Sequence, residues 1–393
     1  MQQAFKCVLL CVVAVGLWGA GNALAADGTA AAEKGQAVVD KAVAFLKTQQ
    51  QKDGSWQKTD REPPAIAAMA LRILMQDPKE GPATPEAKKA VAYLLTTQKD
   101  DGGFYRMMLA NYNTAIIVSV LAKLDDPAVK APVAKGVAFL KANQWTEETQ
   151  TGNGQKAGAD SPFVGGWDYG GGRGRPDLSN TAMVLEALND AGLKKDDPTY
   201  QRALKFVMRM QNRSESNPAE WAGNDGGFIY SAGRNGEGNS SAGEYKTAEG
   251  KRALRSYGSM TYAGLKSMIH AGLTKDDPRV QSAWQWISGN WTLEENPGMS
   301  GMGQDAARAG IFYYYNTLGR SLSAYGQTTV TDSKKAAHDW RVELIDKVAA
   351  SQKLDGSFAG DPRWMEDNPV IATTLAVLAV QDAIRDLQER PTK

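Results

Sequence analysis

The side chains best suited to chemistry lie in a glycine-rich stretch that precedes an apolar segment. Asp168 and Asp177 carry carboxyl groups that could act as a general acid or base. Arg173 and Arg175 lie between them, where guanidinium groups would meet an anionic group of a ligand. Asp177 is equally suited to capping the helix expected after it, because an aspartate oxygen accepts free backbone N–H groups. The stretch therefore offers acid–base or anion-binding chemistry, with helix capping as the alternative for Asp177.

A second group of candidates is aromatic. Tyr313, Tyr314 and Tyr315 are consecutive in an apolar segment, and Tyr257 lies at the start of another. Three consecutive side chains on a helix cannot share one direction, so at least one should face the interior of the fold. These tyrosines would line a pocket for an apolar or ring-shaped ligand. The alternative is that they fill the core as bulky packing groups.

Several other chemistries lack the residues they need. The sequence has two histidines, His270 and His338, and its two cysteines, Cys7 and Cys11, both lie near the start of the chain. We therefore predict no metal site, no cysteine nucleophile and no cofactor. The 45 basic residues are balanced by 44 acidic ones without a basic stripe, which predicts no nucleic-acid partner.

A repeated unit of two helices must position the candidate residues. Each clear copy has a basic residue, an aromatic residue four positions later, a Gln five positions after that, and then a Gly-aromatic turn. Gln50, Gln98, Gln144 and Gln211 mark these copies. A fifth copy has Trp291 where Gln is expected, and a sixth retains Gln352. Repeats of this length indicate stacked supersecondary units.

The first helix of each unit is amphipathic, and the second is apolar almost all round. The apolar helices are expected over residues 66–74, 114–124, 181–188, 260–269, 309–315 and 371–380. A helix without a polar face must be buried on all sides. We therefore predict an all-α fold, an (α/α)6 toroid in which six apolar helices form an inner ring and six amphipathic helices surround it.

Two kinds of turn are expected at opposite ends of the ring. Asp-Pro turns should start the outer helices, with Asp77, Asp126, Asp197 and Asp277 as helix caps. The Gly-aromatic turns lead into the inner helices, so all of them should share one face with the long loops 145–176 and 212–255. This face, the mouth of the barrel, is the predicted functional face.

The first 25 residues predict a secretion signal, with Lys6, a short apolar run and the cleavage site Ala23-Leu24-Ala25. Residues 26–393 are expected to form a single toroid. No later segment is apolar over a length that crosses a bilayer. We therefore expect a secreted or periplasmic protein with no transmembrane anchor after cleavage.

The repeats resemble those of the terpenoid cyclase and protein prenyltransferase superfamily, in particular the QW repeats of squalene–hopene cyclases and of prenyltransferase and squalene oxidase repeat proteins. The resemblance implies an (α/α)6 toroid in which each Gln bonds to helix ends and each turn aromatic packs on the neighbouring repeat. The aromatics that would take this scaffold role are Trp56, Phe104, Trp167, Phe228 and Phe358. The alternative role is stabilisation of a carbocation through the aromatic ring face.

The catalytic motifs of this superfamily match only in part. The segment Asp177-Leu178-Ser179-Asn180-Thr181-Ala182 resembles the Asp-x-Asp-Asp-Thr-Ala motif of the cyclases, whose middle Asp protonates the substrate. Ser179 stands in place of that acid, and Asn180 stands in place of its carboxylate neighbour. The zinc site of prenyltransferases needs a Cys, and related thioester domains need a Cys-Gly-Glu-Gln run that is absent. The resemblance therefore implies a fold whose usual chemistries lack a required group.

Three functions remain open at this point. The first is binding of an isoprenoid-like or other apolar or amphiphilic ligand at the mouth, with Asp168, Arg173, Arg175, Asn180 and the tyrosines as contacts. The second is a terpenoid-cyclase-like or prenyltransferase-like enzyme that acts on a polyprenoid through Asp177 or a nearby carboxylate. The third is a structural module that docks an envelope protein partner through its outer surface.

Overall fold

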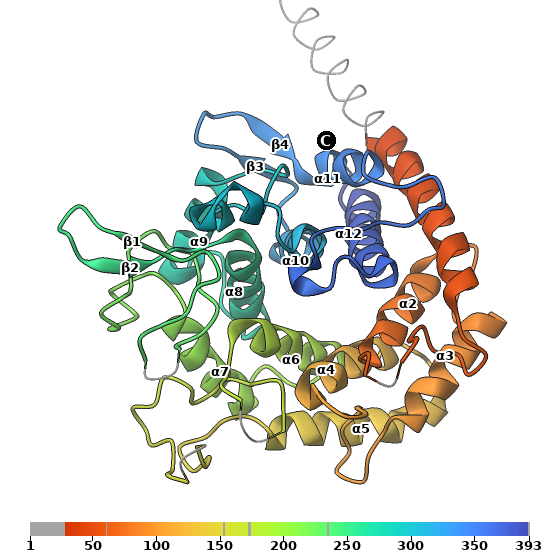
Figure 1. Cartoon of the computed structure of the whole chain (residues 1–393), viewed down its shortest axis with the longest axis horizontal. Coiled ribbons are helices and arrows are strands. Elements are labelled where there is room, and N and C mark those ends of the chain that lie inside the picture. Colours follow the sequence, from red (N-terminus) through yellow and green to blue (C-terminus); the bar gives the residue numbers. More distant parts are fainter. Residues whose placement is uncertain (1–27, 60, 152–153, 172–173, 234–235, 392–393) are drawn as a thin grey trace, which may run out of the picture.

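Six apolar helices form a closed inner ring in the computed structural model of the chain (Figure 1). The structure describes residues 28–59, 61–151, 154–171, 174–233 and 236–391. Each inner helix packs against the next, and the last packs against the first, which closes the ring. The inner helices are α2 (Ala65–Gln76), α4 (Ala110–Leu121), α6 (Leu178–Asp190), α8 (Gly258–His270), α10 (Ile311–Tyr325) and α12 (Pro369–Glu389).

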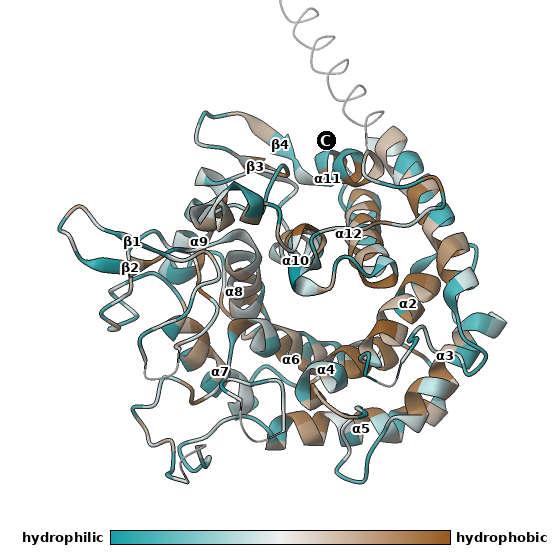
Figure 2. Ribbon diagram, in the orientation of Figure 1, coloured by the Kyte–Doolittle hydropathy of each residue, from teal (hydrophilic) through white to brown (hydrophobic). Residues whose placement is uncertain are grey.

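A second layer of helices surrounds this ring. It consists of a helix over residues 28–49, then α3 (Pro85–Thr96), α5 (Pro127–Ala142), α7 (Pro198–Arg209), α9 (Pro278–Gly289) and α11 (Trp340–Ala349). Figure 2 shows polar residues mainly on this layer and on the connecting loops. The predicted all-α (α/α)6 toroid is confirmed.

Burial explains why the two layers have different sequences. Ten of the twelve residues of α2 are buried, whereas only four of the twelve residues of α3 are buried. An inner helix contacts two inner neighbours and an outer helix, so it has no side on which polar residues can be solvated. The outer helices keep one face in water, and this difference gives the alternating pattern that is visible in the sequence.

The repeated Gln residues join consecutive repeats. Each amide group donates one hydrogen bond to the Gly carbonyl of its own turn and one to a carbonyl in the next outer helix. The second acceptors are Glu86 for Gln50, Pro132 for Gln98, Thr199 for Gln144, Arg279 for Gln211 and Val38 for Gln352. The bond from Gln352 to Val38 (2.9 Å) joins the last repeat to the first. In the fifth repeat Trp291 takes over this role, because its indole N–H donates to Glu343 of α11.

The turn glycines are required because the next repeat lies directly against them. Gly165 has a φ of +96°, and a Cβ atom there would lie 1.9 Å from the carbonyl oxygen of Arg202 in α7. Gly54, Gly102, Gly226 and Gly356 have the same backbone conformation and the same close neighbour, a carbonyl of the following outer helix. The Gly-aromatic turn is therefore part of the contact between repeats.

Replacement of Gly165 by Ala is expected to lower the free energy of unfolding by about 2–4 kcal/mol, from strain of the positive φ and from the carbonyl clash. Gly192→Ala is the matched control, because Gly192 also has a positive φ (+77°) but its Cβ would meet no atom within 4 Å. Urea denaturation of both variants measures the difference. Equal losses would show that the contact with Arg202 does not restrict this position.

The Asp-Pro turns behave as predicted in three of four cases. Asp126, Asp197 and Asp277 cap α5, α7 and α9, and each side chain accepts a backbone N–H of the first turn. The prediction for Asp77 is wrong. Six further residues separate Pro78 from α3, whose cap is Thr84, and the Asp77 side chain instead accepts the N–H of Lys79.

Two short hairpins on the outside of the ring were not predicted (Figure 1). They pair β1 (Glu244–Lys246) with β2 (Arg252–Leu254), and β3 (Thr329–Thr331) with β4 (Ala337–Asp339), both antiparallel. His338 lies on β4 and contacts Glu343. Three short 3-10 helices lie in the loops of the mouth: η1 (Met299–Met302), η2 (Gln304–Ala306) and η3 (Pro362–Trp364).

The predicted secretion signal, residues 1–25, lies outside the described residues, as does Arg173. Among the helices that the structure describes, none combines the length and the apolar character needed to cross a membrane.

Candidate functional site

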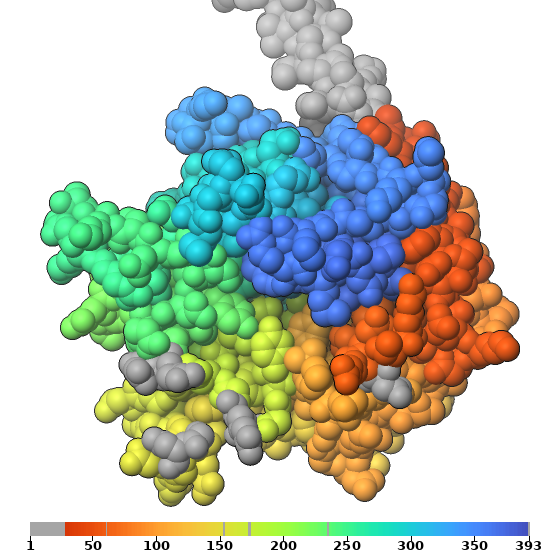
Figure 3. Space-filling model, in the orientation of Figure 1, coloured from red at the N-terminus to blue at the C-terminus, as the bar shows by residue number. Residues whose placement is uncertain are grey.

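A cavity of about 530 Å³ lies inside the ring at the end where the inner helices begin. Residues from the first turns of all six inner helices line it: Ala65, Ile66, Tyr112, Ser179, Ser259, Tyr313 and Ile371. The segment between α11 and α12, blue in Figure 3, lies over the centre of this face and contributes Arg363, Trp364 and Met365 to the cavity wall. The cavity is therefore the predicted mouth, partly covered by one loop.

Five tyrosines give this cavity its polar groups. They are Tyr112, Tyr169, Tyr230, Tyr257 and Tyr313. The hydroxyl of Tyr313 lies 2.8 Å from the hydroxyl of Ser179, and Tyr257 donates to Ser241 at 3.3 Å. Burial raises the pKa of Tyr257 and Tyr313, so these phenols stay neutral. The wall is thus mainly apolar with several uncharged hydroxyl groups, and Asn239 and Arg363 add an amide and a guanidinium group.

The three consecutive tyrosines of α10 separate as their spacing requires. Tyr313 faces the cavity, whereas the hydroxyl groups of Tyr314 and Tyr315 donate to the carbonyls of Thr292 and Leu293 on the outer side. Tyr257 lines the cavity, as the sequence suggested. Tyr314 and Tyr315 are not among its lining residues, because their side chains fill the core between α10 and the segment that follows α9.

Asp177 caps α6 and does not line the cavity. Its carboxylate accepts the backbone N–H of Asn180 (2.8 Å) and the side-chain amide of Asn180 (2.7 Å). The pKa of Asp177 is raised to about 7 because burial disfavours the charged form. Hydrogen bonds from Asn180 and Tyr230 oppose this rise but do not cancel it. Thr181, another retained residue of the motif, accepts the backbone N–H of Trp167. The two polar residues that are retained therefore have structural contacts that account for their presence.

The remaining predicted site residues surround the cavity without entering it. Asp168 is buried and accepts the backbone N–H of Gly170 (2.7 Å) and the side-chain amide of Asn111 (3.3 Å). Asn180 is buried against Asp177. Arg175 is exposed and lines a separate polar pocket of about 440 Å³ that shares Tyr230 and Asn239 with the main cavity.

The turn aromatics are scaffold residues. Trp56, Phe104, Trp167, Phe228 and Phe358 are buried in the core, and none of them lines the cavity among the residues described. Trp167, for example, donates its indole N–H to the carbonyl of Leu140 in the outer helix of its own repeat. Their rings are therefore not placed to stabilise a charged intermediate in the cavity.

The cover of the mouth is anchored by Glu366, which the sequence did not reveal as a site residue. Its carboxylate accepts the backbone N–H of Tyr313 (2.8 Å) and, with the neighbouring N–H groups, caps the start of α10. Gly310, the residue before α10, has no side chain to do this. Glu366 thereby fixes Trp364 and Met365 over the cavity.

Backbone strain also concentrates at the mouth. Three non-glycine residues of the described chain have positive φ, and two of them, Leu109 (58°) and Met365 (61°), line the cavity. Such a conformation costs roughly 1–3 kcal/mol for each residue and persists only where surrounding contacts enforce it. The wall of the cavity is therefore held in shape at a cost to stability.

Exposed large apolar side chains gather on the same face. All of those in the described part of the chain lie in loops that lead from an outer helix to an inner one: Met107, Met108, Tyr169, Met302, Leu354, Trp364 and Met365. Apolar groups gathered in this way commonly mark an interaction site. We call these seven residues the apolar rim.

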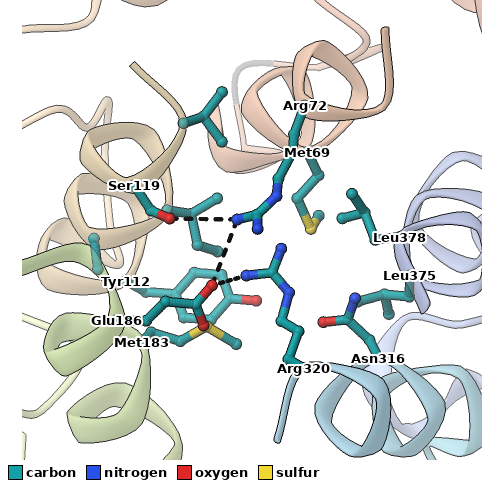
Figure 4. A pocket seen from close by; sticks show the side chains of 13 residues that line it. Met69, Arg72, Tyr112, Ser119, Met183, Glu186, Asn316, Arg320, Leu375 and Leu378 are labelled. Atoms are coloured by element: carbon teal, nitrogen blue, oxygen red, sulfur yellow. Dashed lines mark hydrogen bonds and ion pairs between the residues drawn. The ribbon is translucent and has the colours of Figure 1, made fainter. Parts of the chain in front are cut away.

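The far end of the ring interior is charged. Arg72, Glu186 and Arg320 meet there from α2, α6 and α10, as Figure 4 shows. They line a small cavity of about 30 Å³, which shares Met69, Tyr112 and Leu375 with the mouth cavity. The sequence contains a signal for this cluster, because several otherwise apolar helices each carry a charged residue.

The pKa of Asp177 leads to a pH-dependent prediction. Folded protein keeps Asp177 protonated up to about pH 7, whereas the unfolded chain ionises it above about pH 4, so its contribution to stability declines as pH rises between these values. Asp177→Asn should match the parent protein near pH 4.5 and exceed its free energy of unfolding near pH 8, by at most roughly 4 kcal/mol.

Asp197→Asn is the matched control, because Asp197 also caps a helix but Lys141 lowers the pKa of Asp197 to about 2. Its charge stabilises the fold above pH 4, so the variant should be less stable than the parent near neutral pH. Urea denaturation across this pH range measures both. If the free energies of unfolding of both variants changed in the same way with pH, the opposite pKa shifts of Asp177 and Asp197 would be contradicted.

Comparisons with known proteins find similar chains among solved structures alone. No protein family model matches the chain, and no curated protein matches it. A type II terpene cyclase from Scytonema, MstE, is similar in structure: one of its variants, solved with geranylgeranyl dihydroxybenzoate, has 12% sequence identity, with 90% of this chain and 88% of the other covered at a TM-score of 0.36. A protein from Actinoplanes has 16% identity, with 90% and 99% covered at a TM-score of 0.48.

These TM-scores lie below 0.5, so the ring is established by the helix contacts of this chain itself. The chain has an all-α architecture of repeated helix pairs closed into a ring.

Proposed function

We propose that this protein binds one apolar or amphiphilic molecule in the interior of its ring, entering through the mouth. The observation that carries the proposal is the cavity of about 530 Å³ on the ring axis, which lies in the size range of small-molecule sites. A ring filled by its own side chains would leave no such space.

The character of the wall supports an apolar ligand. Ile66, Met260 and Leu375 contribute aliphatic groups, and the tyrosines contribute ring faces and neutral hydroxyl groups. The apolar rim lies on the face of the mouth, and its Tyr169, Trp364 and Met365 line the cavity, so an apolar molecule would meet compatible side chains as it enters. A ligand suited to this wall has a long apolar body and a single polar end, as isoprenoid alcohols and long-chain alcohols do.

Isothermal titration calorimetry with farnesol and with hexadecanol tests the proposal on the purified protein. We expect one molecule bound per chain and a negative heat-capacity change, because apolar surface is buried. Absence of binding of both alcohols would contradict it.

An enzyme that acts on a polyprenoid is the second candidate, and one contact favours it. Tyr230 lines the cavity and is hydrogen-bonded to Asp177, whose pKa of about 7 suits proton transfer near neutral pH. Asp177 itself is held away from the cavity by its bonds to α6. Conversion of farnesol by the purified protein that is lost in Asp177→Asn would support the enzyme; unchanged binding without conversion supports the binding protein.

We also propose that the protein is exported, on the basis of the signal-like start of its sequence. An envelope protein partner docked on the outer helices remains compatible with a ligand in the ring.

A further inference from the structure

Charged side chains of five inner helices meet at the closed end of the ring interior, opposite the mouth. We call Arg72, Glu186, Lys266, Arg320 and Asp382 the floor cluster. Glu186 of α6 lies at its centre and forms ion pairs with Arg72, Lys266 and Arg320. Asp382 of α12 lies 3.5 Å from Arg320 and 2.6 Å from Arg385. These contacts hold the floor together.

The floor cluster has more positive than negative charge. Its three cations face two carboxylates, and one of those carboxylates, Asp382, is shared with the half-exposed Arg385. Asp190 acts to raise the pKa of Arg72 and Lys266, but it is itself engaged by Ser119 and by Lys123 (2.9 Å). Burial and the neighbouring Arg72 lower the pKa of Arg320 to about 9 and that of Lys266 to about 8. Unbalanced charge in a buried site is unfavourable unless an opposite charge joins it.

Hydrogen-bond donors at the floor are also unused. Nε of Arg72 and the side-chain amide nitrogen of Asn316 are buried and have no hydrogen-bond acceptor among the described residues. Nε of Arg320 has only the ion pair of 3.5 Å with Asp382. All three side chains line the small floor cavity. Buried donors normally find an acceptor, so this group is suited to an oxygen-bearing anion.

We propose that the floor cluster binds the carboxylate head group of the molecule held in the ring, through Arg72, Arg320 and Asn316. The proposal rests on the proposed function and adds to it the ligand class, a long-chain carboxylic acid, and its orientation, with the head group at the floor. The apolar body then fills the mouth cavity, and its far end lies beneath Trp364 and Met365.

The dimensions of the floor cavity select the head group. A volume of about 30 Å³ holds about two water molecules, so the floor cavity admits a small head group such as a carboxylate. Met69, Tyr112 and Leu375 form the wall between the floor and the mouth cavity. Met69 is an unbranched side chain with several rotatable bonds, so a small rotation can open the passage.

The mouth should bind the same carboxylate head group less tightly than the floor does. Arg363 lines the mouth cavity, but it is exposed and already paired with Asp361 (2.8 Å). Water screens a charge in that position, whereas Arg72 is buried and the side chain of Arg320 is only 12% exposed. These two arginines, with their free donors, should therefore outcompete the mouth for the acid.

The test compares acids with alcohols of the same skeleton by isothermal titration calorimetry at pH 7.5, namely farnesoic acid against farnesol and palmitic acid against hexadecanol. We expect each acid to bind at least tenfold more tightly than its alcohol. Equal affinities would overturn the carboxylate site and leave the proposed function standing. Absence of binding of all four compounds would overturn both.

Variants locate the head group. Asn316→Leu and Arg320→Met should each lower the affinity for the acids at least tenfold and leave the affinity for the alcohols within threefold. Arg252→Met, on the exposed hairpin of β1 and β2 outside the ring, is the control and should change neither, and Arg363→Met tests the mouth. Loss of the acid preference in Arg363→Met alone would place the head group at the mouth and overturn the proposal.

Glu186→Gln provides a test in the opposite direction. It removes the carboxylate that now satisfies Arg72 and Arg320 while it preserves the shape of the side chain. We expect the acids to bind this variant more tightly than the parent protein, by severalfold, and the alcohols to bind it equally. Weaker binding of the acids would contradict the role of these arginines, and circular dichroism checks that each variant is folded.

Discussion

Replacement of Ser179 by Trp should weaken binding of the alcohols and acids by at least a hundredfold. Ser179 lies on α6, lines the cavity and bonds to Tyr313 across it, so an indole ring in its place fills the space that the ligand needs. Ser179 also occupies the position at which the resembling cyclases carry their acid, so the variant tests the part of the ring that distinguishes this chain from them.

Ser333→Trp is the control for this experiment. Ser333 is exposed in the hairpin formed by β3 and β4, outside the ring, so its replacement adds the same apolar group without touching the cavity. Calorimetry should give the parent affinity for this variant. If Ser179→Trp binds as tightly as the parent protein, the ligand is not in the ring interior.

Replacement of Glu186 by Met should lower the free energy of unfolding by about 3–5 kcal/mol. The variant leaves Arg72, Lys266 and Arg320 without the carboxylate that they share. Arg72 and Lys266 are buried, and the side chain of Arg320 is only 12% exposed. Removal of one partner from a buried ion pair is costly because the other charge remains in a medium of low polarity. Urea denaturation near neutral pH measures the loss.

Two further variants make this result specific. Glu186→Met combined with Lys266→Met should recover part of the lost stability, because it removes one of the unpaired cations. Glu244→Met breaks an exposed pair with Arg252 and should cost less than about 1 kcal/mol. Similar small losses in all three would mean that the floor cluster is solvated.

The sequence was sufficient to predict the ring because its signals are local and repeated. The Gln residues, the positive-φ glycines and the buried turn aromatics each recur at one position of every clear repeat, and each makes the same contact with its neighbour. The all-apolar second helix of every repeat requires burial on all sides, and a closed ring provides it. Agreement among these signals made the prediction robust.

The candidate site was harder to predict because its contacts are not local. Glu366 acts on α10 from a different repeat, and Arg72 and Arg320 each reach Glu186 from another repeat, so no spacing in the sequence relates them. Asp177 and Thr181 resembled catalytic residues because the same positions serve the scaffold, as cap and as hydrogen-bond acceptor. A retained residue of a catalytic motif can thus reflect the fold alone.

The three consecutive tyrosines of α10 could be predicted only in part. Helix geometry predicted that one of Tyr313, Tyr314 and Tyr315 would face the interior, but it could not say which one. The choice depends on how α10 is rotated in the ring, and the carbonyls of residues 292 and 293 fix that rotation by accepting the hydroxyl groups of Tyr314 and Tyr315.

A crystal structure with palmitic acid that carries a bromine atom at its far end tests the central claim most directly. The account predicts a single strong bromine signal inside the mouth cavity, beneath Trp364, with density that continues toward the floor. Bromine signals confined to the outer surface of the ring, with an interior filled by side chains, would contradict it.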